Sequence, residues 1–268
     1  MLTDSQIEQW LAEDVGHHDV TNQVPGETTG RLVAKDDGVA AGLDAAVSVF
    51  EYLGVDATPL VDAGDRIAAG DAVLETAGPA RETLRAERVA VNVAGHASGI
   101  ATRTRNAVDA AREVDDDVRI AATRKTTPGL RGIEKRAVVA GGGDTHRLDL
   151  SHMVMVKDNQ VAEMGLEGAI AHFRERVSFA TKIEVEVESP EDGARAAEAG
   201  ADIVLFDNLS PDAVERGVDL LPERTLAEAS GGITVEDVPD YAATGVDVVS
   251  MGSLTHSAPA LDYSFRTG

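Results

Sequence analysis

The chain has 268 residues, of which 43% are hydrophobic but only 3% aromatic, so its core must be built mainly from aliphatic side chains. It contains no cysteine, which excludes disulfides, zinc–thiolate sites and thiol nucleophiles. Its formal net charge of -23 argues against nucleic acids and anionic membranes as partners.

The N-terminal part of the chain mixes helices and strands. Thr3 and Gln6 have the spacing of a capping box and predict the start of a helix. Residues 61–74 resemble the hairpin of lipoyl or biotinyl carrier modules, but they contain no lysine to modify, so we interpret them as structural turns. We expect Gly95 and Gly99 to break the last helix of this region. The pattern predicts, in order, a strand, a helix, two strands and a long alanine-rich helix over residues 30–34, 43–53, 57–61, 72–76 and 79–112.

From about residue 118, short apolar runs alternate with helical segments. This alternation is typical of parallel strands joined by helical crossovers. The one long gap, residues 124–151, predicts a functional or mobile loop. Six strands are fewer than the eight of a closed barrel, so we predict an open or irregular parallel α/β barrel. The predicted strands are residues 119–122, 153–156, 183–187, 203–206, 225–229 and 246–250, with helices over 190–199, 211–220 and 235–243.

Charged residues follow almost every predicted barrel strand. In a parallel barrel the active site gathers at the carboxyl ends of the strands. Charged groups are poor core material, so their presence after five of six strands indicates an active site. In strand order these ends carry Arg124 and Lys125, Lys157 and Asp158, Glu186, Asp207 and Asn208, Glu228, and Gly252.

Small-residue turns follow the last two strands, and a helix start is expected just beyond the first of them. Loops in this position, together with a helix N-terminus, form the recurrent phosphate site of such barrels. Two tight turns without a ligand are the alternative, but the pairing favours phosphate. The turns contain Ser230, Gly231 and Gly232, and Gly252 and Ser253.

A basic segment runs from Arg119 to Lys157, with eight Lys or Arg against three acidic residues. Three of the cations, Arg131, Lys135 and Arg136, fit a solvated helix face. Arginine forks match carboxylates, lysine suits pyrophosphate, and nearby carboxylates suit ribose hydroxyls or a metal-bound water. We therefore predict a barrel enzyme for a phosphorylated sugar and a second substrate that carries carboxylates. The residues that predict it are Arg124, Lys125, His146, Arg147, Lys157, Glu186 and Asp207.

The acidic composition also predicts that the protein works in concentrated salt. Only five of the 24 basic residues are lysines, and a carboxylate-rich, lysine-poor surface keeps a protein hydrated in concentrated salt. We therefore expect the protein of a halophile.

No apolar run reaches the ~20 residues of a membrane span. The N-terminal sequence lacks the regions of a signal peptide, so we expect a cytoplasmic protein.

Several short motifs lie along nearly the whole chain. The most distinctive is TRKTTPG at residues 123–129. The other motifs are residues 19–21 (DVT), 87–92 (ERVAVN), 98–102 (SGIAT), 142–147 (GGDTHR), 157–159 (KDN), 183–187 (IEVEV), 205–208 (LFDN), 228–233 (EASGGI) and 252–257 (GSLTHS). Together, and in this order, they resemble the motifs of quinolinate phosphoribosyltransferases.

The resemblance implies an α/β sandwich domain over residues 1–110, completed by about residues 255–268, and an open barrel over residues 111–254. It implies transfer of phosphoribose from phosphoribosyl pyrophosphate to quinolinate in the presence of Mg²⁺, with decarboxylation to nicotinate mononucleotide for NAD synthesis. It also implies a homodimer, sometimes a hexamer, with shared active sites.

The resemblance further implies a role for each site residue. Four of them, Lys125, Lys157, Glu186 and Asp207, are expected to be catalytic. Arg88 of a neighbouring subunit, Arg124, His146 and Arg147 would hold the quinolinate carboxylates; Lys125 and Lys157 would lie near the pyrophosphate; Glu186 and Asp207 would hold ribose hydroxyls; and Ser230, Gly231, Gly232, Gly252 and Ser253 would hold the 5-phosphate.

Two positions depart from the family pattern: Gln160 stands where the family usually has histidine, and residues 93–97 read VAGHA. The nearest alternative function is that of a related phosphoribosyltransferase acting on nicotinate or another base. A non-catalytic phosphosugar-binding or carrier protein is the alternative from another class. The full set of three arginines and His146 favours a dicarboxylate over nicotinate, and the hairpin without lysine argues against a carrier.

Overall fold

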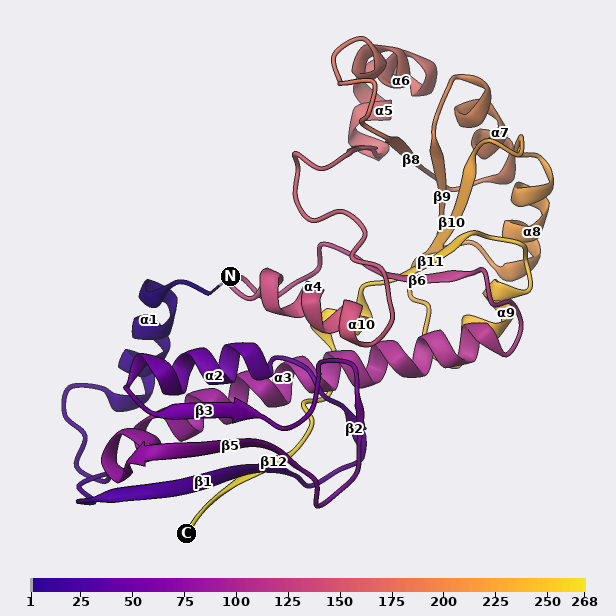
Figure 1. The fold of residues 1–268 in the computed structure, drawn as a ribbon. Helices are drawn as coiled ribbons and strands as arrows, with labels where there is room; N and C mark the ends of the chain where they lie inside the picture. Colours follow the sequence, from indigo (N-terminus) through magenta and orange to yellow (C-terminus); the bar gives the residue numbers. More distant parts are fainter. Residues whose placement is uncertain (1) are drawn as a thin grey trace. The chain divides into compact units, whose positions relative to one another are not determined.

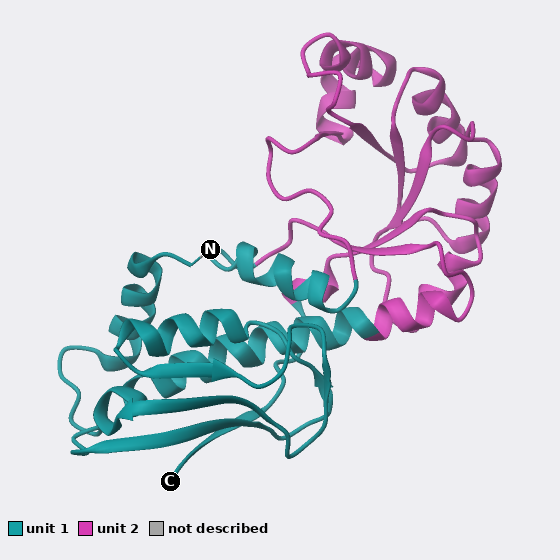
Figure 2. Cartoon of the chain, in the orientation of Figure 1, with its two compact units in different colours: residues 1–105, 127–142, 257–268 teal, residues 106–126, 143–256 magenta. Residues whose placement is uncertain are grey.

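The structure, a computed structural model, describes residues 2–268. The chain forms two compact units (Figure 2). Unit 1 comprises residues 1–105, 127–142 and 257–268, and unit 2 comprises residues 106–126 and 143–256. None of the helices within residues 2–268 combines the length and apolar character that crossing a membrane requires.

Unit 1 is built on an antiparallel sheet with the strand order β12-β1-β5-β3 (Figure 1). Leu32 and Leu74 face each other across β1 and β5 and are buried with Val49 and Phe50 of α2. The C-terminal strand β12 pairs with β1, so the end of the chain completes this sheet. The elements are α1 (Asp4–Val15), β1 (Glu27–Ala34), β2 (Gly38–Val39), α2 (Leu43–Tyr52), β3 (Asp56–Pro59), β4 (Arg66–Ile67), β5 (Ala72–Pro79), α4 (Arg131–Ala140) and β12 (Tyr263–Thr267).

Helix α3 (Ala80–Arg112) is continuous, so the predicted breaks at Gly95 and Gly99 were wrong. Both glycines face the C-terminal segment. A Cβ on Gly99 would lie 2.0 Å from the carbonyl oxygen of Pro259, and one on Gly95 would lie 2.8 Å from that of Leu261. Glycine is needed here because the two backbones approach closely, and this contact offsets its helix penalty of ~1 kcal/mol relative to alanine.

The predicted capping box at the start of α1 is absent. Thr3 occupies the N-cap position, but its side chain makes no cap hydrogen bond. The Gln6 side chain instead donates to the carbonyl oxygen of Gly129 at 2.7 Å. The helix is therefore stabilised by burial of Ile7 and Leu11 in the unit 1 core rather than by a side-chain cap at its N-terminus.

The segment predicted as a long loop contains helix α4, and residues 127–142 pack in unit 1 although they were predicted to belong to the barrel. One reason is a tight contact with α3: a Cβ on Gly141 would lie 2.5 Å from the carbonyl oxygen of Ala101. Glu134, 0% exposed, accepts a hydrogen bond from His96, within the VAGHA segment of α3, at 2.9 Å. Lys135 is 3% exposed, so the solvated helix face predicted for this residue was wrong.

Unit 2 contains a parallel sheet with the strand order β6-β11-β10-β9-β8-β7, which confirms all six predicted strands. Within the described residues no strand pairs with the outer side of β7, and the outer side of β6 carries only an isolated bridge to Asp144, so the barrel is open, as predicted. Helices α5 to α8 flank the sheet (Figure 1). The elements are β6 (Arg119–Ala122), β7 (Val154–Val156), α5 (Asp158–Met164), α6 (Leu166–Arg174), β8 (Ile183–Val187), α7 (Pro190–Glu198), β9 (Ile203–Asp207), α8 (Pro211–Asp219), β10 (Leu226–Ser230), α9 (Val238–Ala242), β11 (Val248–Met251) and α10 (Ser253–His256).

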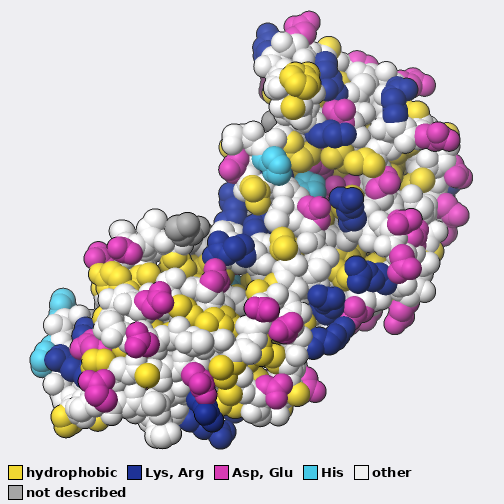
Figure 3. Space-filling view, in the orientation of Figure 1, with side chains coloured by type: hydrophobic (Ala, Val, Ile, Leu, Met, Phe, Trp, Pro, Cys, Tyr) yellow, Lys and Arg dark blue, Asp and Glu magenta, His cyan; other side chains and the backbone are white. Residues whose placement is uncertain are grey.

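The aliphatic core of unit 2 lies between the sheet and these helices. Val185, Val204 and Phe206 of the strands are buried with Ile170 of α6 and Val214 of α8. Carboxylate side chains are spread over both units on the face that Figure 3 draws. On this face, the acidic residues behind the net charge of -23 are therefore dispersed rather than gathered in one tract.

Candidate active site

A pocket of about 340 Å³ lies at the carboxyl ends of the unit 2 strands. Each strand, or the segment directly after it, contributes to its wall, because parallel strands present their carboxyl ends at one edge of the sheet. The structure brings eight predicted side chains together here: Arg124, Lys125, His146, Arg147, Lys157, Glu186, Asp207 and Ser230. The remaining lining residues are Thr123, Met155, Leu205, Glu228 and Ser250.

Two arginines that line this pocket have buried hydrogen-bond donors without a partner in the described part of the chain. Arg147 is 7% exposed, and its Nη2 lies 3.1 Å from the Sδ of Met155. The Nε atoms of Arg124 and Arg147 are both buried and have no acceptor among residues 2–268. Burial, followed by repulsion from Arg124, lowers the pKa of Arg147. Since arginine stays protonated in proteins, the pair presents two neighbouring cations to one anion.

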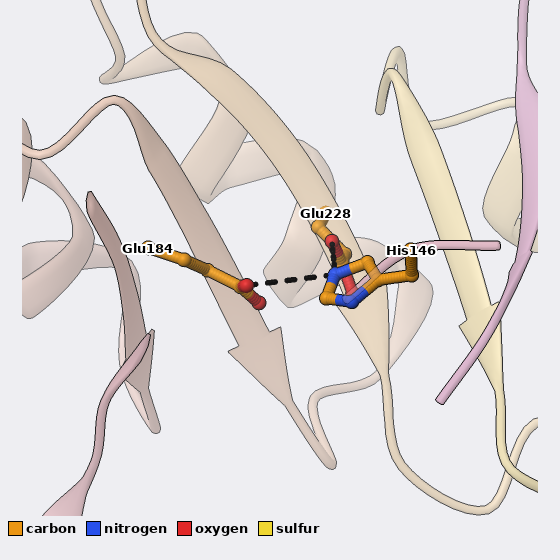
Figure 4. A group of neighbouring side chains, drawn as sticks. All are labelled: His146, Glu184 and Glu228. Atoms are coloured by element: carbon orange, nitrogen blue, oxygen red, sulfur yellow. Dashed lines mark hydrogen bonds and ion pairs between the residues drawn. The ribbon is translucent and has the colours of Figure 1, made fainter. Parts of the chain in front are cut away.

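His146 lies against two buried carboxylates (Figure 4). Its Nε2 is 3.1 Å from Glu228 Oε2 and 3.5 Å from Glu184 Oε2. Burial acts to lower the pKa of His146, but the close contact with the carboxylates of Glu184 and Glu228 and their negative charge outweigh it and raise the pKa to about 10. The two carboxylates thus favour the imidazolium form of His146.

Glu184 was missed at the sequence level, and Glu228 was placed at the strand ends without a role. The signal for Glu184 was its spacing from Glu186, because residues two apart on a strand share one face. If Glu186 points into the barrel, Glu184 must do so one step deeper. Glu184 is 0% exposed and Glu228 is 1% exposed, so both carboxylates lie inside the barrel.

Lys157, just after β7, and Glu186, on the neighbouring strand β8, form an ion pair in the pocket lining. The backbone N–H of Lys157 donates to Gln160 Oε1 at 3.0 Å, at the start of α5. Gln160, one of the two departures from the family pattern, therefore caps helix α5 at Lys157, the cation predicted to lie near the pyrophosphate. On the next strand, Asp207 Oδ2 accepts a hydrogen bond from the side chain of Asn208 at 2.7 Å.

The turns after the last two strands are held close to their neighbours. Gly231 has φ 102°, and a Cβ there would lie 2.5 Å from the backbone nitrogen of Asn208, so only glycine fits. The helix start expected just beyond this turn was wrong, since α9 begins only at Val238. After β11, α10 begins directly with Ser253, whose Oγ is buried and has no partner in the part of the chain described. Ser230 lines the pocket, whereas the other predicted turn residues lie outside its lining: Gly231, Gly232, Gly252 and Ser253.

Arg88 belongs to unit 1 and is not part of the pocket wall, which unit 2 forms alone. It lies on α3 with a side chain 59% exposed, and Glu87 Oε1 lies 3.8 Å from its Nη2. The other eight side chains thus define the site, and Arg88 is the one predicted carboxylate ligand that this pocket does not contain.

The fold and the pocket define a class of protein: a parallel α/β barrel enzyme whose strand ends bind anionic substrates. Within this class, the chain belongs to the quinolinate phosphoribosyl transferase family. It matches the N-terminal domain of that family over residues 19–98 and the C-terminal domain over residues 100–266.

Individual relatives cover nearly the whole chain. A protein of Methanothermobacter thermautotrophicus named "probable nicotinate-nucleotide pyrophosphorylase (carboxylating)" is 44% identical over 97% of both chains. The nicotinate-nucleotide pyrophosphorylase (carboxylating) of Homo sapiens is 40% identical over 97% of this chain and 90% of its own. The crystal structure of NadC from Streptococcus pyogenes has a TM-score of 0.93 at 40% identity, covering 99% of this chain and 97% of its own.

Proposed function

We propose that the protein transfers phosphoribose from phosphoribosyl pyrophosphate to quinolinate and releases pyrophosphate, CO₂ and nicotinate mononucleotide, a step in NAD synthesis. The observation that carries this proposal is the pair of buried arginine Nε donors beside the His146 cation. In a chain of net charge -23, three cations on one pocket wall fit a small substrate with two carboxylates.

The three cations hold quinolinate, and the opposite wall receives the sugar. Lys125 and Lys157 face the pyrophosphate as point charges. Glu186 and Asp207 accept hydrogen bonds from the ribose hydroxyls. The 5-phosphate binds at the turns after β10 and β11, where backbone N–H groups and the free Ser253 Oγ are its donors.

Positioning and charge carry the reaction, because no side chain acts as a nucleophile. The pyridine nitrogen forms a bond to the anomeric carbon while the bond to pyrophosphate breaks, and the electron pair leaves with pyrophosphate. Lys125 and Lys157 stabilise the charge that develops on this leaving group. The new pyridinium then accepts the electrons of the bond to the 2-carboxylate, CO₂ departs, and the ring carbon takes a proton from solvent.

Mg²⁺ enters as part of the second substrate, bound to the pyrophosphate, whose oxygens are its preferred ligands. Lys157 is paired with Glu186 and its side chain is 43% exposed, so it can turn toward the pyrophosphate while Glu186 accepts from a ribose hydroxyl.

Arg88 completes the site from a second copy of the chain. Its side chain on α3 is 59% exposed. It forms a long ion pair, at 3.8 Å, with the adjacent residue Glu87. We infer from this a homodimer with shared active sites, either alone or within a hexamer.

The test is an assay of pyrophosphate and CO₂ release with quinolinate and, separately, with nicotinate. We expect both products from quinolinate and neither from nicotinate. Pyrophosphate release from nicotinate alone would identify instead a related phosphoribosyltransferase of the same fold. Binding of phosphoribosyl pyrophosphate without turnover of either base would identify a phosphosugar-binding protein.

A further inference from the structure

The buried carboxylates Glu184 and Glu228 have no part in the roles given so far. Three of their four oxygens, both of Glu184 and Oε1 of Glu228, are buried without a hydrogen-bond partner among residues 2–268. Burying an ionised carboxylate is costly unless a cation is close by. Two such groups facing one histidine are therefore expected to serve the site rather than to stabilise the fold.

We propose that Glu184 and Glu228 are positioning residues, which hold the His146 ring through Nε2 as a cation and leave Nδ1–H as a charged donor for a substrate carboxylate. This inference rests on the proposed function, because the carboxylate it concerns is one of the two on quinolinate. It goes beyond that function in assigning the preference for a dianion to two residues that do not touch the substrate.

The orientation of the ring supports this assignment. Nε2 is turned toward both carboxylates and Nδ1 away from them (Figure 4). No atom among residues 2–268 accepts a hydrogen bond from Nδ1. The backbone of His146 is also fixed, with φ 50° and its N–H donating to Asp144 Oδ1 at 2.7 Å.

The protonation state decides what Nδ1 can do. Because ionised carboxylates only accept, the contact with the two glutamates favours a proton on Nε2. In a neutral ring Nδ1 would then be an acceptor and would repel a substrate carboxylate. Only the imidazolium donates from both nitrogens, so the buried pair converts His146 into a donor toward the pocket.

The charges around the ring add up to a neutral site. The groups that face it are Glu184 of β8, Glu228 of β10 and Arg147, with Arg124 beside Arg147 and Glu186 farther along β8. Burial raises the pKa of Glu184, and His146 and Arg147 oppose this with their positive charge. The three cations His146, Arg147 and Arg124 thus match the three carboxylates in number, and all three cations remain donors for the substrate.

A metal ion is the competing occupant, because one ligand atom from each of His146, Glu184 and Glu228 lies within 4.8 Å of the others. A divalent ion there would displace the proton from His146. Together with Arg147 it would leave an excess positive charge in a buried site. The charge balance therefore favours the proton over the metal.

The first experiment uses the free protein and needs no substrate. We label the histidines with ¹⁵N, assign His146 with a His146→Gln variant, and follow the ring nitrogens by NMR from about pH 6 to about pH 10. His146 should stay doubly protonated to about pH 9, whereas in Glu228→Gln it should titrate close to the ordinary value of ~6.5. A neutral His146 ring at pH 7 in the unchanged protein would overturn the inference.

The second experiment measures kcat and KM of Glu184→Gln and Glu228→Gln, with Glu215→Gln on the exposed face of α8 as the matched loss of one charge. We expect KM for quinolinate to rise about tenfold, in line with loss of one charged hydrogen bond, and more at pH 8.5 than at pH 6. KM for phosphoribosyl pyrophosphate should not change. A merely structural role would alter both substrates and would not shift the pH profile.

The two experiments separate the failure of this inference from that of the proposed function. A wild-type protein that is inert toward quinolinate would refute the proposed function, while the NMR titration still decides the state of His146. An active wild type with unaltered Glu184→Gln and Glu228→Gln variants would refute the inference alone. So would one equivalent of tightly bound metal per chain that Glu184→Gln abolishes.

Discussion

Replacing Arg147 by alanine should weaken quinolinate binding far more than binding of phosphoribosyl pyrophosphate. The Arg147 side chain is one of the least exposed cations of the chain, at 7%, and its buried Nε has no protein acceptor. A bound carboxylate would fill this donor. Losing a hydrogen bond to a charged group costs about 1.5–3 kcal/mol, which corresponds to a roughly 10- to 100-fold increase in Kd for quinolinate.

Calorimetric titration with each substrate measures the difference. Arg147 also attracts Glu184 and contacts Met155, so its loss can destabilise unit 2, and thermal melting must accompany the titrations. Arg216→Ala, on the exposed face of α8, removes one arginine from the same unit without touching the pocket. Arg147→Lys keeps the charge but not the planar fork and should fall between the two.

Equal loss of affinity for both substrates in Arg147→Ala would show that this side chain recognises no particular one. Unchanged quinolinate affinity in a well-folded variant would remove Arg147 from the site altogether. Either result would refute the reasoning from the unfilled buried donor.

Three further predictions concern assembly, salt and packing. Mixing inactive Arg88→Ala with inactive Lys125→Ala should restore part of the activity through hybrid sites, and no recovery after verified subunit exchange would contradict a shared site. The melting temperature should rise between dilute buffer and molar KCl, because the screening length shortens from ~10 Å at 0.1 M to ~3 Å at 1 M and screening reduces the repulsion within a chain of charge -23. A melting temperature that stays flat or falls with salt would show that the acidic surface is incidental. Gly99→Ala should lower the free energy of unfolding by about 1–3 kcal/mol or more, because its Cβ would lie 2.0 Å from the Pro259 carbonyl oxygen. Gly168→Ala, whose Cβ would have its nearest neighbouring atom at 3.9 Å, should be neutral or stabilising. Denaturant titration of both variants measures the difference.

The barrel was predictable because its signals are local. Each of the six parallel strands is a short apolar run, and a charged residue marks the carboxyl end of most of them. Arg124, Lys157 and Asp207 are far apart in the sequence, yet the rule for parallel sheets is enough to predict that they line one pocket.

Two glycines of α3 show where prediction from the local sequence failed. At Gly95 and Gly99 the helix propensity of the residue predicted a break, but contact with the segment before β12 requires glycine and the helix continues. The position of α4 was missed for the same reason, because its buried Glu134 and Lys135 look like surface residues until α3 is packed against them.

By itself, the sequence determined the family, the succession of strands and helices along the barrel segment and the side chains that reach the strand ends, because these depend on residue type and on spacing along the chain. Only the tertiary structure decided that Glu184 and Glu228, 44 positions apart, meet at one nitrogen of His146 and keep it charged. The charge state of a histidine depends on the burial of its neighbours and on distances of a few ångströms, and neither is encoded in any local pattern.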